Sequence, residues 1–202
     1  MNWSQTSRPT SPPTLYVLIG LPGSGKTTRA RDLEGQQHAL RLTPDEWMIP
    51  LFGDNDANGK RDVLEGRFIS LARSALRMGI SVILDFGVWS KNERSALRFL
   101  ASEAGANCEL VYLHIDSIEQ HGRVQRRQGA SPESTFPMTP EDLAEWAGRF
   151  EAPDESELTS SEIPPPPDGF ESWDSWSAHR WPSSGTEVHD PRAVEPAQHE
   201  AF

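Results

Sequence analysis

Eight residues near the start of the chain have the composition of a phosphate-binding loop. They are Gly20, Leu21, Pro22, Gly23, Ser24, Gly25, Lys26 and Thr27, and they match the pattern G-x-x-x-x-G-K-[ST] in full. The glycines allow backbone N–H groups to turn toward phosphate oxygens, and the helix that follows presents its positive end. Lys26 can reach the β and γ oxygens of a nucleotide, Thr27 can place its hydroxyl on Mg²⁺, and Thr28 extends the loop. The alternative is a glycine-rich turn with an incidental lysine.

The elements around this loop are those of an α/β fold. Apolar runs at residues 15–19, 38–42, 81–85 and 109–115 predict buried strands, and a short strand near Leu158 is expected to complete the sheet. Helical patterns cover residues 26–34, 62–78, 91–104, 117–128 and 139–150. Strands that are nearly all apolar and alternate with helices predict a mostly parallel central sheet with helices on both faces. We therefore expect a three-layer sandwich of the P-loop NTPase class.

The acidic excess of the chain lies mainly in its last quarter. The formal net charge is −11, and residues 151–202 hold 12 acidic but only 2 basic side chains. We expect a disordered N-terminus (1–13), a kinase-like domain (14–160) and an acidic, Pro- and Trp-rich tail (161–202) that is disordered or loosely docked. This tail either folds back on the core or binds a protein partner.

Composition also limits the partners and the cellular compartment that we expect for the protein. No block of basic residues predicts a nucleic-acid surface, and no apolar run has the length of a membrane span. The single cysteine excludes an internal disulfide and fits a reducing compartment, so we expect a cytoplasmic protein.

The order of motifs resembles the P-loop kinases related to polynucleotide kinase, gluconate kinase and the zeta toxins, often described as AAA-type ATP-binding proteins. The resemblance covers about residues 14 to 157. It implies ATP as the donor, Mg²⁺ as the cofactor, and transfer of the γ-phosphate to a hydroxyl of a small molecule such as a metabolite, nucleoside, nucleotide sugar or antibiotic. A regulatory or scaffold protein that binds nucleotide and hydrolyses it weakly is the alternative.

The resemblance assigns a catalytic role to Asp45 in "RLTPDEWM". In these kinases an acidic residue after the second strand accepts the proton of the attacking hydroxyl. In the alternative interpretation, Asp45 only caps the helix that contains Trp47, and Glu46 is the base in its place. Trp47 stands where related kinases often carry an arginine, which favours an acceptor with a stacking or apolar face.

Four further residues are assigned by the same resemblance. Asp85, at the end of the third strand, is expected to hold a Mg²⁺-bound water or an acceptor hydroxyl, and Arg94 is expected to contact substrate. Structural roles are the alternatives for both. Arg123 and Arg127 share one helix face and match an R-x-x-x-R lid that closes over ATP, although arginines on a solvated face are also common.

Overall fold

The computed structural model describes residues 11–54, 56–130, 138–159 and 162–184. Its sheet contains four parallel strands in the order β2-β3-β1-β4. These are β1 (Thr14–Ile19), β2 (Leu40–Leu42), β3 (Val82–Leu84) and β4 (Asn107–Tyr112). Eight helices accompany them among the described residues: α1 (Lys26–Gln37), α2 (Asp45–Phe52), α3 (Lys60–Arg77), α4 (Lys91–Glu103), α5 (Ser117–Ala130), α6 (Pro140–Arg149), α7 (Glu155–Thr159) and α8 (Trp173–Arg180).

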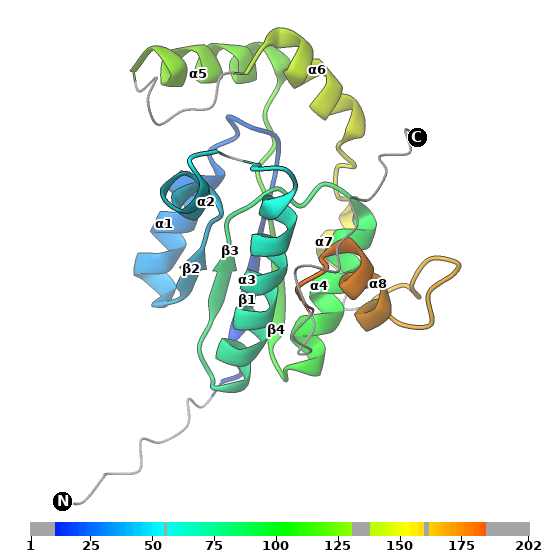
Figure 1. The fold of residues 1–202 in the computed structure, drawn as a ribbon. Helices are drawn as coiled ribbons and strands as arrows, with labels where there is room; N and C mark the ends of the chain where they lie inside the picture. Colours follow the sequence, from blue (N-terminus) through cyan, green and yellow to red (C-terminus); the bar gives the residue numbers. More distant parts are fainter. Residues whose placement is uncertain (1–10, 55, 131–137, 160–161, 185–202) are drawn as a thin grey trace, which may run out of the picture.

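The helices form layers on the two faces of the sheet (Figure 1). Alternate side chains of β1 point to opposite faces, so Val17 packs in the cluster of α3 and α4, whereas Leu18 packs in the cluster of α1. Both strand positions are fully buried, as expected for a parallel sheet covered on both sides. The predicted three-layer α/β sandwich is therefore confirmed. Figure 1 shows α5 and α6 above the end of the sheet where the parallel strands terminate.

Parallel pairing brings the carboxyl ends of all four strands to one edge. Val17 pairs with Leu84, Leu42 pairs with the same residue from the other side, and Ile19 pairs with Tyr112. The segments that leave these strands therefore begin side by side, and they carry the loop after β1, Asp45 after β2 and Asp85 after β3. In open parallel sheets, ligands bind at this edge.

Helix ends agree with the sequence predictions to within a few residues, with one instructive exception. The glycine at position 35 was expected to end α1, but the helix continues to Gln37. It ends instead at His38, which adopts a left-handed conformation with φ of 50°. The helix predicted from residue 139 begins at a capping box, since Thr139 and Asp142 exchange side-chain and backbone hydrogen bonds.

The strand expected near Leu158 is absent from the sheet of the described residues, and that prediction is wrong. Residues Glu155–Thr159 form the short helix α7 instead. Asp154 starts this helix, because its Oδ1 accepts a hydrogen bond of 2.8 Å from the backbone N–H of Glu157.

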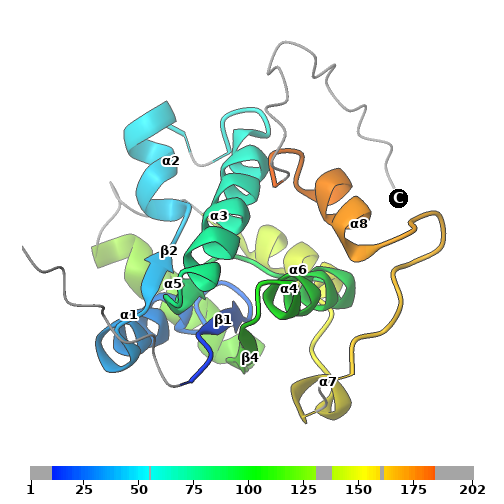
Figure 2. The ribbon, with the colours of Figure 1, turned by 90° about the horizontal axis from the view of Figure 1, so that it is seen from below.

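The chain from residue 162 to Ser184 is packed on the domain, which agrees with the predicted alternative that the tail folds back on the core. Trp173, Trp176 and Trp181 lie in the same apolar cluster as Leu97 and Leu100 of α4. Figure 2 shows α8 beside α4, on the side of the sheet that carries α3. Burial of three large aromatic side chains outweighs the acidic and proline-rich composition of this segment. Residues 185–202 and the predicted N-terminal segment up to Thr10 lie outside the described residues.

No helix in the described part of the chain is both long enough and apolar enough to cross a membrane.

The packing of α8 gives a stability prediction. Trp181 is 1% exposed, so we expect Trp181→Ala to lower the free energy of unfolding by about 3–5 kcal/mol, since it leaves a large cavity. Chemical denaturation monitored by circular dichroism measures this change. Ile118→Ala is the control, because Ile118 is 86% exposed and its truncation should change stability by less than about 0.5 kcal/mol. Equal stability of the Trp181→Ala variant and the wild type would contradict the packing of α8.

Candidate nucleotide and acceptor site

The predicted phosphate-binding loop connects β1 directly to α1. Gly23 and Gly25 have φ angles of 83° and 96°, a region that favours glycine. A Cβ on Gly23 would lie 3.2 Å from Cγ2 of Val124, so α5 also restricts this position to glycine. The loop closes on itself, because the N–H of Ser24 donates to the carbonyl of Leu21 at 3.1 Å.

Lys26 lies inside this loop. Its Nζ donates hydrogen bonds to the carbonyl oxygens of Gly20 at 2.7 Å and Leu21 at 3.0 Å. Burial lowers the pKa of Lys26 to about 8, although the negative charges of Asp85 and Asp45 oppose this shift. A buried ammonium that is bonded only to carbonyl groups can bind an anion, whose negative charge would neutralise it.

Further features of the loop fit bound phosphate. Oγ of Ser24 is buried and has no hydrogen-bond partner among the described residues. Buried polar atoms of this kind are rare in folded proteins unless a ligand or water completes them. Together with the glycine backbone and Lys26, the residues present therefore fit the phosphates of a nucleotide.

Thr27 and Asp85 meet at the edge of the sheet beside the loop. The hydroxyl of Thr27 lies 3.5 Å from Oδ1 of Asp85, which is 4% exposed. A hydroxyl and a carboxylate are oxygen ligands of the kind that Mg²⁺ prefers, with phosphate oxygens and waters supplying the rest. The described residues contain no group of three or more His, Cys, Asp or Glu side chains that could hold a metal alone. The predicted pair thus fits Mg²⁺ bound together with a nucleotide.

Arg41 contacts Asp85 and was not identified from the sequence. Its Nη1 lies 3.2 Å from Oδ2 of Asp85, its Nη2 lies 2.7 Å from Glu46 and its Nε lies 3.3 Å from Glu34. Burial raises the pKa of Asp85, and the charge of Arg41 opposes this shift. Arg41 therefore favours the ionised form of the predicted metal ligand. Its position inside a short strand, between two leucines, gave no sign of this role.

Asp45 is the first residue of α2. Its charge and that of Asp85 both act on the pKa of Lys26, so the two carboxylates lie near the Lys26 ammonium. The neighbouring Glu46 instead pairs with Arg41 and, at 3.3 Å, with Arg31 of α1. The residue that caps α2 is Pro44, and no side chain of the described residues bonds to this helix end. Pro44 rather than Asp45 thus occupies the cap position of α2, and the catalytic role of Asp45 stays a prediction.

The carboxylate of Asp45 is paired with an arginine from α3. Nη2 of Arg61 lies 2.9 Å from Oδ1 of Asp45, and its Nε lies 3.1 Å from Oε1 of Glu65. Burial lowers the pKa of Arg61, but the charges of Asp45 and Glu65 outweigh it and raise the pKa overall. Arg61 could not be identified from the sequence, because the residues around Arg61 are those of any solvated arginine at a helix start.

An apolar surface adjoins Asp45. Trp47 is 48% exposed and makes an edge-to-face contact with Phe68, with ring centroids 5.4 Å apart. Ile49, Leu51 and Phe52 of the same helix are also exposed. Part of the Trp47 ring is therefore accessible from solvent, and its contact with an acceptor stays a prediction.

The helix predicted as a lid lies against the phosphate-binding loop. Nε2 of Gln120 donates to the carbonyl of Pro22 at 3.0 Å, and Nη1 of Arg123 donates to the carbonyl of Gly23 at 3.4 Å. Arg123 also pairs with Glu119 at 2.6 Å. Arg127 is close enough for its charge to lower the pKa of Lys26. Both predicted arginines thus lie beside the loop, Gln120 joins them, and the expected flexible segment after Gly129 falls mostly at residues 131–137, outside the described residues.

Arg94 does not lie in this crevice, which corrects the expectation of a substrate contact. It is 1% exposed and forms a buried ion pair with Glu157 of α7. Its Nη1 also donates to the carbonyl of Glu151 at 2.8 Å. Arg94 is on the inner side of α4, where α7 covers it, so its guanidinium ties the chain after α6 to the core.

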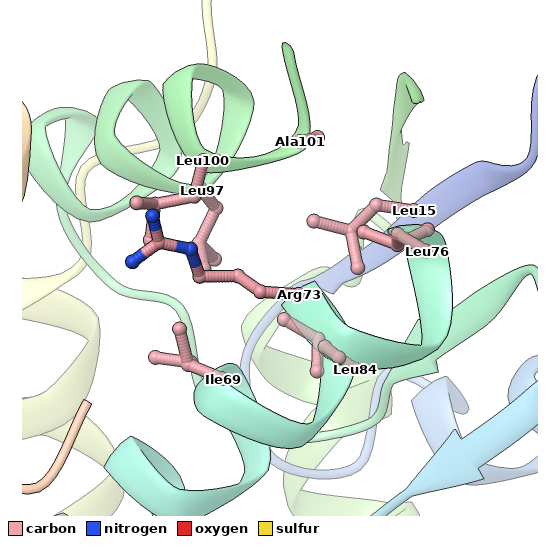
Figure 3. Close-up of a pocket in the computed structure, with 9 residues that line it drawn as sticks. Leu15, Ile69, Arg73, Leu76, Leu84, Leu97, Leu100 and Ala101 are labelled. Carbon is pink, nitrogen blue, oxygen red and sulfur yellow. The ribbon is translucent and has the colours of Figure 1, made fainter. Parts of the chain in front are cut away.

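Two other features of the domain do not form reactive sites. Burial raises the pKa of Cys108 to about 12, so its thiolate is not available near neutral pH. A small pocket between α3 and α4 is lined by leucines and other apolar side chains together with Arg73 (Figure 3). None of its lining residues belongs to the phosphate-binding loop or to α5.

Residues 54–65 match the spacing of an EF-hand calcium loop, D-x-D-x-N-G-x5-E, which the sequence analysis overlooked. The structure gives this match no support. Glu65, at the position that supplies the bidentate ligand, is buried and pairs with Arg61. Asp54 and Asp56 instead accept hydrogen bonds from the backbone of their own turn.

Fold and loop together define a P-loop protein of the kinase-like, nucleotide-binding class. A family model described as an AAA domain matches residues 15–153, and the chain belongs to that family. The match confirms the resemblance inferred from the motifs.

Several solved structures share the fold. A component of the Pnkp1/Rnl/Hen1 RNA repair complex is 20% identical, with a TM-score of 0.58, covering 72% of this chain and 46% of that one. Kti12 from Chaetomium thermophilum, in complex with ADP-AlF3, is 20% identical, with a TM-score of 0.53, covering 85% and 99%. A sugar kinase from Janibacter is 17% identical, with a TM-score of 0.50, covering 71% and 81%. A search of curated proteins gave no match.

The buried ammonium of Lys26 gives a prediction for nucleotide binding. Phosphate charge should raise the pKa of Lys26 from about 8, so binding between pH 8 and 10 takes up a proton. Affinity for ATP·Mg²⁺ should therefore fall as the pH rises through this window, by up to about tenfold per pH unit. Titration calorimetry at pH 9 in buffers of different ionisation enthalpy measures the proton uptake.

Lys26→Arg is the matched control, because a guanidinium stays charged throughout this range. Proton uptake should vanish in that variant if it still binds nucleotide. Lys26→Ala should lose most of the thermal stabilisation by ATP while remaining folded. Undiminished ATP binding by Lys26→Ala would contradict the assignment of the loop.

Proposed function

We propose that the protein transfers the γ-phosphate of ATP to a hydroxyl of a small molecule, with Asp45 as the general base. The observation that carries the proposal is the different environment of the two acids in the first turn of α2. The charge of Asp45 acts on Lys26, whereas Glu46 is held by Arg41 and Arg31. A carboxylate opposite a phosphate-binding loop suits an acceptor hydroxyl that attacks the terminal phosphorus.

Each residue would have a defined task in this reaction. Lys26, Arg123 and Arg127 hold and neutralise the phosphate oxygens, and Thr27 with Asp85 would hold Mg²⁺, which supplies charge stabilisation. Asp45 takes the proton of the acceptor hydroxyl. The acceptor oxygen then bonds to the γ-phosphorus while the bond from that phosphorus to the bridging oxygen breaks, which leaves ADP.

The surface beside Asp45 supports an acceptor with an apolar or stacking face. Trp47, Ile49 and Phe52 expose apolar area on α2. Among the expected classes, a nucleoside, an antibiotic or another molecule with a ring fits this surface better than a uniformly polar sugar.

A nucleotide-binding regulatory protein with weak ATPase activity is the second candidate. One observation favours it, because both carboxylates near Lys26 are already paired: Asp45 with Arg61, and Asp85 with Arg41. In such a pair the arginine occupies a carboxylate oxygen that a substrate hydroxyl would otherwise contact.

Labelled ATP·Mg²⁺ with a metabolite extract distinguishes the two candidates. We expect label on an acceptor other than water, and a loss of about 100-fold or more in transfer by Asp45→Asn. Glu46→Gln is the matched control and should keep most of the transfer activity, because its carboxylate faces α1. Release of label only as inorganic phosphate, at equal rates in the wild type and Asp45→Asn, would reject the kinase proposal in favour of the regulatory protein.

A further inference from the structure

The C-terminal segment, residues 162–184, contacts the first two turns of α3. It lies outside the family match at residues 15–153, yet its helix α8 is packed on α4 (Figures 1 and 2). The start of α3 also carries Arg61, which pairs with Asp45.

Arg180, the last residue of α8, joins three helices. Its Nη1 lies 2.9 Å from Oδ1 of Asp62 on α3, and its Nε lies 2.8 Å from Oε1 of Glu93 on α4. Glu93 is itself fixed, because its other oxygen accepts backbone N–H bonds from Trp89 at 2.6 Å and Ser90 at 3.0 Å. Arg180 therefore ties the first turn of α3 to a rigid capping box.

The residues after α8 hold the second turn of α3. Oγ of Ser183 donates to the carbonyl of Val63, and Nη1 of Arg67 donates to the carbonyl of Ser183 at 3.3 Å. Gly66 lets the two backbones approach closely, since a Cβ there would lie 3.0 Å from the backbone nitrogen of Ser184. Two successive turns of α3 are thus held by residues 180–184.

This anchored part of α3 carries the arginine that contacts the proposed base. Arg61 precedes Asp62 in the chain and pairs with Asp45 and Glu65. Burial raises the pKa of Glu65 to about 7, against the charges of Arg61 and Arg180, both of which act on its carboxyl. Arg61, Glu65 and Arg180 therefore belong to one interacting group of charges that extends from α8 to Asp45.

We propose that Arg180 is a positioning residue: by fixing the first two turns of α3, it holds Arg61 beside the carboxylate of Asp45. The catalytic part of this inference depends on the proposed role of Asp45 in phosphoryl transfer. The mechanical part, that α8 orders the start of α3, stands independently and can be tested without an acceptor.

Hydrogen exchange of the ADP·Mg²⁺-bound protein tests the mechanical part. In Arg180→Gln we expect exchange of the backbone amides of residues 64–68 to rise by about tenfold or more, because these amides make the first intrahelical bonds of α3. Arg77→Gln is the matched control: it removes the same charge from an exposed position at the other end of α3 and should change nothing there. Faster exchange confined to α8 in Arg180→Gln would overturn the proposal.

Asp62→Asn provides a second test of the same contact in case Arg180→Gln does not fold. It removes the same contact from the α3 side and leaves the pair between Arg180 and Glu93 in place. It should loosen residues 64–68 in the same way, and unchanged exchange in Asp62→Asn would also overturn the proposal.

Kinetics test the positioning role once an acceptor has been identified. Arg180→Gln should lower kcat by about tenfold, because a carboxylate that Arg61 no longer holds in place is misplaced relative to the γ-phosphate. The KM for ATP should change little, since the phosphate-binding loop is untouched. In an Arg61→Gln background, Arg180→Gln should cause no further loss, because its effect passes through Arg61. Equal losses in both backgrounds would overturn the positioning role. If the wild type transfers phosphate to no acceptor, the proposed function fails, whereas the exchange experiment still decides whether α8 orders α3.

Discussion

One buried charge, the ammonium of Lys26, determines how the rest of the site is arranged. It lies in the turn between β1 and α1, bonded to two carbonyl groups of its own loop. Burial makes this charge expensive, and the carboxylates of Asp85 and Asp45 reduce the cost without contacting it as ion pairs. Those carboxylates reach the crevice because β2 and β3 end at the same edge as β1. The parallel sheet is therefore the means by which three separate segments are brought around one cation.

The two sides of the crevice differ in how firmly they are held. On the nucleotide side, α5 meets the loop through Gln120, Arg123 and Val124, and Arg123 is half exposed. On the acceptor side, α3 is packed in the core and is further bound by the segment after α8. Elements with few buried contacts open at lower free energy than core elements do. The start of α3 is therefore held by more buried contacts than the part of α5 beside the loop.

The sequence predicted the parts of this arrangement that depend on local pattern. The loop around Lys26 has a fixed spacing, and the buried strands are short apolar runs, so both could be identified from residue types alone. Asp85 could be placed because it ends such a run. The roles of Arg41 and Arg61 could not be predicted, because each depends on carboxylates that come from other elements.

Dependence on other elements also explains why two predictions were wrong, namely the substrate contact of Arg94 and the strand near Leu158. Arg94 has the sequence signature of a surface arginine on a helix, and only the fold of residues 154–159 brings Glu157 over it. The helix α7 replaced a predicted strand for the same reason, since Asp154 caps it and Glu157 is drawn inward by Arg94. The predictions for α4 and for residues 154–159 were each made from one segment alone, whereas the ion pair between Arg94 and Glu157 depends on both segments.

The acidic C-terminal segment shows that net charge is a poor guide to docking. Its composition is acidic and proline-rich, but Asp174 pairs with Arg73 of α3, while Trp173 and Trp176 enter the core. Burying a tryptophan contributes several kcal/mol, which exceeds the repulsion between acids that remain solvated and partly paired. A segment beyond the matched family domain can thus become part of the core, and from there Arg180 reaches the helix that carries Arg61. The acceptor side of this site is consequently built from more of the chain than the motifs of a P-loop kinase indicate.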